Sequence, residues 1–247
     1  MSASCMETEV AIERPPLLHI SIQTRDAAHA GEGLADYQDG QLAALGRRGY
    51  AGVTSARPIE WEAEECLLLL AYSDQGRLVG GIRMQRHRAK RPMPCVVALR
   101  SYCEEVAAVV EEHASREESG EVCGLWVDSE LAGVGLGPAL TALAMSQAKA
   151  FLGRWAWGIC PRALYPGYQR AGFEKMDQLG EGGSFWYAAA AERGLIIRAD
   201  LQVSSMSDGG PRLTRPSFAR GRDGRLATRP TRGELVIDYD LCRLREV

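Results

Sequence analysis

Apolar residues gather in short runs separated by charged residues, glycine and proline, which predicts short strands alternating with helices. The turn Asp74-Gln75-Gly76 lies between two such runs and predicts a β-hairpin. A further strand is predicted to begin at Phe173. The five clearest strands are residues 17–22, 66–73, 77–84, 121–127 and 154–160.

Several segments have apolar residues at helical spacing or a helical composition. Residues 27–48 have such a composition, but Gly31, Gly33 and Gly40 interrupt it. Glycine is unfavourable inside a helix, which argues against one long helix there. The predicted helices are residues 97–115, 137–151 and 162–171.

The C-terminal part has a different composition. Residues 194–203 and 233–241 predict two more strands, and the segment between them is rich in arginine, glycine, serine and proline. A loop of this length is either disordered or functional, as a lid or as a docking surface for an acidic partner. The predicted organisation is a flexible lead at 1–15, one domain at 16–203, the loop at 204–232 and a returning strand within 233–247.

Composition and charge narrow the class of protein. With 247 residues, 46% hydrophobic and 25% charged, the chain has the profile of a soluble globular domain. The formal net charge of −3 argues against a general nucleic-acid or anionic-membrane binder. No apolar run reaches the length of a membrane span, and the N-terminus does not have the pattern of a secretory signal.

The seven cysteines are scattered and form no Cys-x-x-Cys pair. This usage predicts buried free thiols and a cytoplasmic protein. The four histidines share no ligand spacing with a pair of cysteines, so no metal site is expected.

A glycine-rich turn carries the most chemical information. It spans residues 132–138, follows the strand 121–127 and opens the helix 137–151. Glycines let the backbone approach a ligand, and a helix N-terminus contributes partial positive charge. Together they predict a cradle for phosphate groups. A dinucleotide-binding fold is a poor alternative, because the Gly-x-Gly-x-x-Gly spacing and an acidic ribose partner are missing.

About thirty residues downstream, Tyr168-Gln169-Arg170-Ala171-Gly172-Phe173 forms a second motif. With the glycine-rich turn it resembles the GNAT superfamily of acyl-CoA-dependent N-acyltransferases, over about residues 60–190. The resemblance implies an α/β (α+β) fold with a mixed, mostly antiparallel sheet flanked by helices and splayed between its fourth and fifth strands. It carries no information about the acceptor.

The resemblance also implies that the acyl thioester of CoA, or of an acyl carrier protein, binds along the end of the fourth strand and the turn. The chain departs from the family at Ala132, where arginine or glutamine usually helps to hold the pyrophosphate. The backbone amides of the cradle remain. The implied donor-binding residues are Trp126, Val127, Ala132, Gly133, Val134, Gly135, Leu136, Gly137 and Pro138.

Three residues are candidates for the chemistry. Gly124 either marks a β-bulge or only permits close packing, and beside a bulge the resemblance implies that the amide of Leu125 polarises the thioester carbonyl. Glu121 is either a general base with a raised pKa or a solvated carboxylate at a strand end. Tyr168 either matches the family's general acid for the leaving thiolate, with Tyr165 as a substitute, or only packs in the core.

Other carboxylates offer alternatives to Glu121 as the base, recognise a cationic acceptor, or only form an acidic surface. These are Glu60, Glu62, Glu64 and Glu65.

Residues 118–128 and 131–137, with residues 182–187, also resemble the branch of this fold that contains N-acyl amino acid synthases and is related to acyl-homoserine-lactone synthases. This resemblance implies long acyl chains delivered by an acyl carrier protein. The basic segment 83–91 then offers a dock for an acidic carrier, if it is not a solvated loop or a site for the 3′-phosphate of CoA. Alternation places Trp155 and Trp157 on one face. The aromatic residues that either pack in the core or line an acyl tunnel are Trp126, Trp155, Trp157, Phe185 and Trp186.

The chain is therefore predicted to be an N-acyltransferase in which an amine attacks the thioester directly in a ternary complex. No cysteine lies at a recognisable nucleophile position, which favours direct transfer. The acceptor stays open among small molecules, amino acids and peptides. The alternative is a catalytically degenerate domain that binds CoA or a protein partner, which Ala132 favours.

Overall fold

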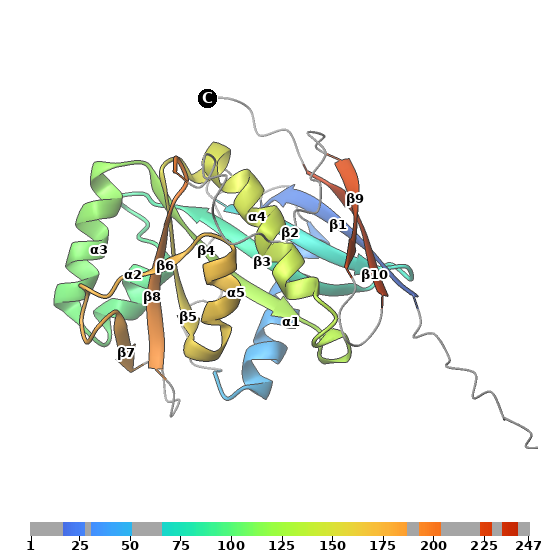
Figure 1. The fold of residues 1–247 in the computed structure, drawn as a ribbon, viewed down its shortest axis with the longest axis horizontal. Coiled ribbons are helices and arrows are strands. Elements are labelled where there is room, and N and C mark those ends of the chain that lie inside the picture. The colour runs from blue at the N-terminus through green and yellow to red at the C-terminus, as the bar shows by residue number, and fades with distance from the viewer. Residues whose placement is uncertain are drawn as a thin grey trace, which may run out of the picture.

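A computed structural model describes residues 17–27, 31–50, 66–186, 193–203, 223–228 and 234–241 of the chain. They form one mixed sheet with helices packed against it (Figure 1). The strands are β1 Leu17–Asp26, β2 Cys66–Ser73, β3 Leu78–Arg86, β4 Ser119–Val127, β5 Trp155–Pro161, β6 Glu174–Lys175, β7 Ser184–Trp186, β8 Arg193–Asp200, β9 Asp223–Thr228 and β10 Glu234–Asp240. The helices are α1 Glu32–Arg47, α2 Pro94–Arg100, α3 Glu104–Arg116, α4 Leu136–Leu152 and α5 Tyr165–Arg170, with single-turn helices at Ser129–Leu131 and Arg162–Leu164.

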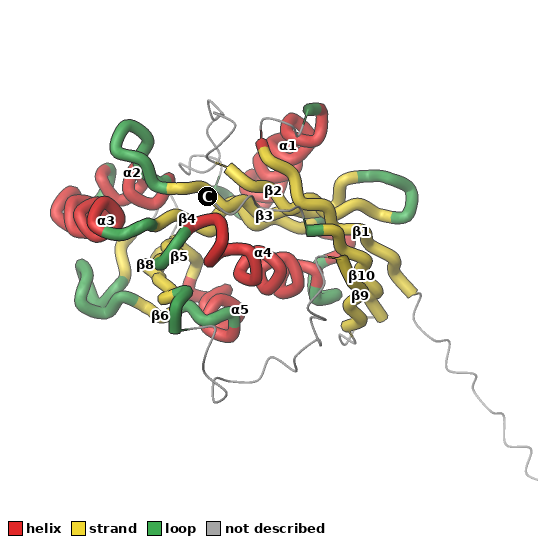
Figure 2. The backbone as a smooth tube through the Cα atoms, turned by 90° about the horizontal axis from the view of Figure 1, so that it is seen from above, coloured by secondary structure: helices red, strands yellow, loops and turns green. Residues whose placement is uncertain are grey.

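The sheet has the strand order β6-β8-β5-β4-β3-β2-β1-β10-β9, and β7 pairs with β8. The strand pairs are antiparallel except for β1 with β10 and β4 with β5, which are parallel. Figure 2 shows α4 and α5 on one face of the sheet and α1 and α2 on the other. The mixed, mostly antiparallel sheet flanked by helices confirms the predicted fold class.

The apolar run in β2 is explained by these two layers of helices. Residues 66–71 are buried at every position, because both faces of the sheet are covered there. Leu69 packs in the same cluster as Leu140 of α4, whereas Leu68 packs with Tyr37 of α1. A central strand covered on both sides needs apolar residues at successive positions instead of alternating ones.

The sheet opens between β4 and β5. Their parallel pairing covers only Ser119–Glu121 against Trp155–Trp157. Beyond these residues β4 keeps its pairing with β3 as far as Val127, and β5 keeps its pairing with β8 as far as Pro161. The predicted splay between the fourth and fifth strands is therefore present.

The prediction that glycines interrupt the helix in residues 27–48 was wrong. α1 is one helix that passes through Gly33 and Gly40. A Cβ atom on Gly40 would overlap the ring of Trp126, so glycine is the residue that lets α1 lie close to β4. Tertiary packing here outweighs helix propensity.

Three other boundaries differ from the prediction. The helix expected at 97–115 is divided into α2 and α3 at Ser101–Cys103. Arg100 lies in the last turn of α2 and acidic residues lie in the first turn of α3, so each helix has charges that suit its own dipole. Residues 223–228, expected within a loop, form β9 against β10. The strand expected from Phe173 is shortened to the two residues of β6.

The predicted C-terminal strand is β10, which pairs with β1 and brings that end of the chain beside the N-terminal strand. The lead at 1–15 and the loop residues 204–222 and 229–232 lie outside the described residues. Within the described part of the chain, no helix has the length and apolar character to cross a membrane.

Candidate active site

β4 carries a β-bulge where the sheet opens. The register of β3 against β4 shifts between Gly81 and Arg83, and Gly124 has a φ of +64°. Glu121 and Trp126 are an odd number of positions apart, yet both lie on the face that α1 and α2 cover. Only an extra residue in the strand allows this, because side chains otherwise alternate between faces. Of the two alternatives for Gly124, the bulge is confirmed.

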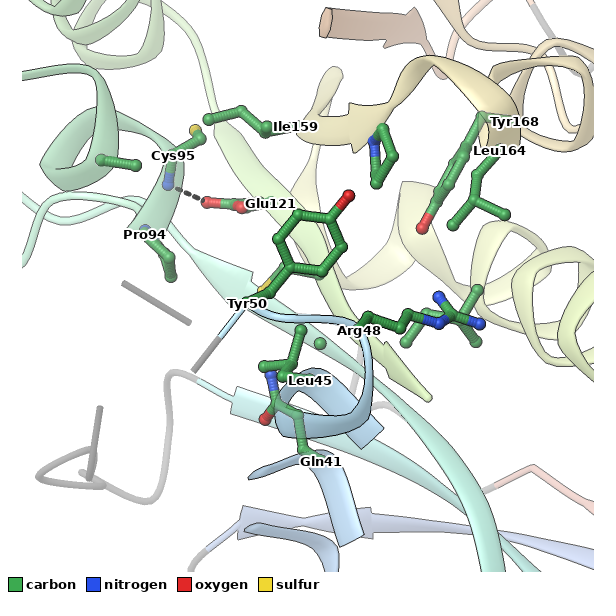
Figure 3. A pocket seen from close by; sticks show the side chains of 15 residues that line it. Gln41, Leu45, Arg48, Tyr50, Pro94, Cys95, Glu121, Ile159, Leu164 and Tyr168 are labelled. Carbon is green, nitrogen blue, oxygen red and sulfur yellow. Dashed lines mark hydrogen bonds between the residues drawn. The ribbon is translucent and has the colours of Figure 1, made fainter. Parts of the chain in front are cut away.

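A small cavity of about 100 Å³ lies beside the bulge. Its walls come from α1 and the residues after it, the start of α2, β4, β5 and α5. Figure 3 shows Glu121 and Tyr168 on opposite sides of this cavity, with the ring of Tyr50 between them in this view. Polar groups that were far apart in the sequence therefore face one confined space.

Glu121 is buried, with 3% of its surface exposed. Its Oε2 atom accepts the backbone N–H of Cys95 at 2.6 Å, at the start of α2. Burial raises the pKa of Glu121 from 4.5 to about 7, although the hydrogen bonds with Cys95 and the charge of Arg83 act in the opposite direction. The alternative of a solvated carboxylate is wrong. A carboxyl that titrates near neutral pH can accept a proton from a substrate.

A larger groove of about 580 Å³ extends from the bulge to the glycine-rich turn. α4 begins there, after Gly135 with a φ of +90°. Val134 does not line the groove, because its side chain is buried in the core. The other predicted donor-binding residues do line it: Trp126, Val127, Ala132, Gly133, Gly135, Leu136, Gly137 and Pro138.

The small cavity and the large groove share a set of lining residues, and we call this shared region the junction. Tyr168 is 8% exposed there, and its ring packs edge-on against Phe173 with 5.6 Å between ring centroids. Burial raises the pKa of Tyr168, so its hydroxyl keeps its proton near neutral pH. The residues of the junction are Leu45, Arg48, Leu125, Leu164 and Tyr168.

Solved structures share this architecture. ElaA from Escherichia coli aligns with a TM-score of 0.53 at 11% identity, covering 73% of this chain and 99% of ElaA. FeeM, an N-acyl amino acid synthase from uncultured soil microbes, aligns with a TM-score of 0.53 at 11% identity, covering 75% of this chain and 92% of FeeM. An acyl-CoA N-acyltransferase from Pseudomonas aeruginosa aligns with a TM-score of 0.51 at 15% identity, covering 73% and 99%. The chain has the GNAT fold.

At these identities the likeness is one of fold. A scan against protein-family models and a search of curated proteins found no match. The roles of individual residues in this chain therefore follow from its own geometry.

Within the GNAT fold, the structure brings the three predicted catalytic residues together. Leu125 and Tyr168 belong to the junction, and Glu121 lines the adjoining cavity. Tyr165 lines neither space, because its hydroxyl accepts the backbone N–H of Lys175 at 3.1 Å on another side of α5. Tyr165 is therefore not placed to substitute for Tyr168. The alternative carboxylates at residues 60–65 lie outside the described residues.

The five aromatic residues do not form one tunnel. Trp126 packs against α1, whereas Trp157 and Phe185 pack with α2 and α3. Trp186 is 58% exposed. The predicted common face of two tryptophans is confirmed, because the guanidinium of Arg198 lies over both rings, at 4.0 and 5.1 Å.

The basic segment lies away from the groove. Arg86 donates to the carbonyl oxygen of Phe151 in the last turn of α4, and residues 86–89 line a separate cavity there. The glycine-rich turn is at the other end of α4, whose 17 residues span about 25 Å. The segment therefore does not lie beside the glycine-rich turn, and its role as a dock for a carrier, as a site for the 3′-phosphate or as a solvated loop stays a prediction.

Sequence reasoning missed the contribution of α1. Arg47 and Arg48 at its C-terminal end line the groove that also contains Ala132. They add positive charge to a groove whose turn lacks the usual cation. Two adjacent arginines at a helix end were visible, but no spacing rule connects them to a turn more than eighty residues later. Among the described residues, no group of histidine, cysteine and carboxylate side chains is arranged to hold a metal.

Proposed function

We propose that this protein is an N-acyltransferase that moves an acyl group from a thioester of CoA or an acyl carrier protein to an amine of a small molecule, amino acid or peptide. One observation carries the proposal. The small cavity, with the buried carboxyl of Glu121, adjoins the large groove and shares Leu125 of β4 and Tyr168 with it as lining residues. A donor lying in the groove then has its thioester at the junction, and an amine in the cavity reaches it.

In the proposed reaction, the uncharged amine nitrogen attacks the carbonyl carbon of the thioester. Glu121 takes the proton that this nitrogen loses, directly or through a water. The amide of Leu125 donates to the carbonyl oxygen as negative charge develops on it. The carbon–sulfur bond then breaks, and the hydroxyl of Tyr168 gives its proton to the departing thiolate. Exchange with water restores both side chains, and the products are an amide and a free thiol.

The thiols in the cavity support direct attack over an acyl-enzyme. Cys95 and Cys123 line the small cavity. Burial raises the pKa of both thiols, to about 12 for Cys123, so neither is a thiolate at neutral pH. The reactive form of cysteine is the thiolate, which these sites disfavour.

The groove supports the donor class that we propose. Its backbone cradle at the start of α4 suits phosphate oxygens, and Arg48 supplies a guanidinium that can pair with them. CoA and the carrier-protein arm both carry phosphate and pantetheine, so the groove fits either. We extend the proposal to long acyl chains, which the size of the groove supports, and to the N-acyl amino acid synthase branch.

The donor proposal is tested by thermal unfolding of the protein with CoA, acetyl-CoA, a long-chain acyl-CoA, an acyl-carrier thioester and pantetheine. A bound donor at about a hundred times its dissociation constant adds about 2.7 kcal/mol of stability. Arg48→Ala is expected to weaken CoA about tenfold, the loss of one charged hydrogen bond, and to leave pantetheine unchanged. Arg116→Ala, at an exposed arginine paired with Glu112, is the matched control.

Two outcomes would count against this reading. A wild-type protein that none of the donors stabilises contradicts the proposed function. Donor binding without transfer to any amine favours the alternative, a CoA-binding module, which is motivated by the alanine at position 132.

Tyr168→Phe tests the proton for the leaving group. The ring contact with Phe173 remains, so the fold is retained, while turnover of a CoA thioester is expected to fall about 10²-fold. A thioester of an acidic aryl thiol needs no proton on leaving, so the variant is expected to use it almost as well as the wild type. Single-turnover rates with both thioesters make the comparison, and equal losses on the two substrates would refute the acid role.

We also propose a cytoplasmic location. The cysteines that the structure describes, at positions 66, 95, 103, 123 and 160, are free thiols. Free thiols suit a reducing compartment.

A further inference from the structure

We propose that Tyr37 of α1 is a positioning residue of this site: its hydroxyl holds the peptide group between Gly124 and Leu125 and thereby aims the N–H of Leu125. The inference rests on the proposed function, in which that N–H donates to the thioester oxygen. Tyr37 lines neither the small cavity nor the large groove, so it acts through the backbone of β4.

The contact between Tyr37 and Gly124 is short, and its donor is buried. Tyr37 is completely buried, and its hydroxyl donates to the carbonyl oxygen of Gly124 at 2.7 Å. Burial raises the pKa of Tyr37, so the hydroxyl stays protonated and remains a donor across the physiological range. The carbonyl oxygen of Gly124 in the bulge is therefore hydrogen-bonded by Tyr37 of α1, which lies 87 residues earlier in the chain.

Glycines on two neighbouring strands make room for the Tyr37 side chain. A Cβ atom on Gly81 of β3 would come within 2.8 Å of the ring. A Cβ atom on Gly124 of β4 would overlap the hydroxyl oxygen. The register shift of the bulge lies between the same two strands. The ring is thus held in one place, with its hydroxyl against the bulge.

Fixing one end of a peptide group fixes the other. The group is planar and trans, so the carbonyl of Gly124 and the N–H of Leu125 point in opposite directions. Because Tyr37 anchors the carbonyl, it also sets the direction of the N–H, which belongs to a residue of the junction. A hydrogen bond to the carbonyl also polarises the amide and makes its N–H a stronger donor.

Infrared difference spectroscopy of a bound long-chain acyl-CoA with a ¹³C-labelled thioester carbonyl tests this directly. In the wild type, binding is expected to lower the carbonyl stretching frequency relative to water, because the N–H of Leu125 polarises the bond. Tyr37→Phe is expected to return the frequency toward its value in water and to lower kcat about tenfold, with the donor dissociation constant unchanged. 3,5-Difluorotyrosine in place of Tyr37 is a stronger donor and is expected to lower the frequency further.

The fluorinated side chain keeps the ring and the hydroxyl, so this arm stands even if Tyr37→Phe fails to fold. Tyr165→Phe removes another tyrosine hydroxyl that bonds the backbone, away from both spaces, and is expected to leave the frequency unchanged. A wild-type frequency shift that neither change at Tyr37 alters would overturn the inference and leave the proposed function intact. A donor that binds the wild type without any shift would instead remove the proposed carbonyl polarisation itself.

Discussion

Glu121→Gln is expected to lower turnover by about 10²- to 10⁴-fold, because the variant loses the group that accepts the amine proton. The glutamine side chain keeps an oxygen for the N–H of Cys95, so donor binding and the fold are retained. Initial rates at saturating donor measure the loss. Glu118→Gln, at an exposed carboxyl just before β4, serves as the control and is expected to act like the wild type.

The pH dependence of kcat/KM is a second test of Glu121 as the base. The base works when deprotonated, so its contribution to the wild-type kcat/KM is expected to rise with pH and level off above about 7, the pKa of Glu121. The ratio of wild-type to Glu121→Gln profiles cancels the titration of the acceptor amine. That ratio is expected to rise through pH 7. A flat ratio, or a variant with wild-type turnover, would exclude Glu121 as the base.

The raised pKa of Glu121 also makes the stability of the fold depend on pH, and this stability falls as the activity rises. The folded protein holds the Glu121 proton up to about pH 7, whereas an ordinary glutamate loses it near 4.5. Stability relative to Glu121→Gln is therefore highest below pH 4.5, falls as pH rises to 7, and is constant above it. The total fall is at most about 3 kcal/mol, from 1.36 kcal/mol per unit of pKa.

Gly124→Ala is expected to lower turnover by about 10²- to 10³-fold, the usual effect of losing one donor to a developing oxyanion. Alanine is strained at a φ of +64°, and its Cβ atom would overlap the hydroxyl oxygen of Tyr37. The bulge must then shift and take the Leu125 amide with it. Urea unfolding is expected to show a loss of about 1–3 kcal/mol.

Two further variants separate the causes. Gly124→Ala with Tyr37→Phe removes the overlap but not the backbone strain, so part of the stability is expected to return while the turnover stays low. Gly46→Ala, in the last turns of α1 with no atom near the added Cβ, is the matched control. It is expected to leave turnover unchanged and to stabilise the helix by up to about 1 kcal/mol. Wild-type turnover in Gly124→Ala would show that the bulge has no part in the reaction.

Much of the fold could be predicted because its signals are local. The hairpin of β2 and β3, the strand β4 and the glycine-rich turn each have their signal within about ten residues of sequence. α1 was misjudged for a physical reason. The cost of Gly40 in a helix is visible in the sequence, but the contact with Trp126 that offsets it joins residues 86 positions apart.

The residues of the candidate site also differ in whether a local sequence signal marks them. Glu121 and Tyr168 could be named because they lie in elements that carry the motifs. The burial that raises the pKa of Glu121 could not be predicted, because it depends on the start of α2 packing over β4. Tyr37 and Arg48 had no signal, because they belong to the site only through the crossing of α1 beneath the bulge.

The short pairing of β4 with β5 has a consequence for how such a protein could change its preference among acyl chains. The strands on the β4 side of the sheet and those on the β5 side are joined by only three residue pairs. The angle between these two groups of strands sets the width of the gap between β4 and β5. That angle depends on what is packed between and behind them, including the α2–α3 cluster around Trp157. Chain-length preference could therefore change through substitutions in this cluster at residues, such as Trp157, that line neither the small cavity nor the large groove.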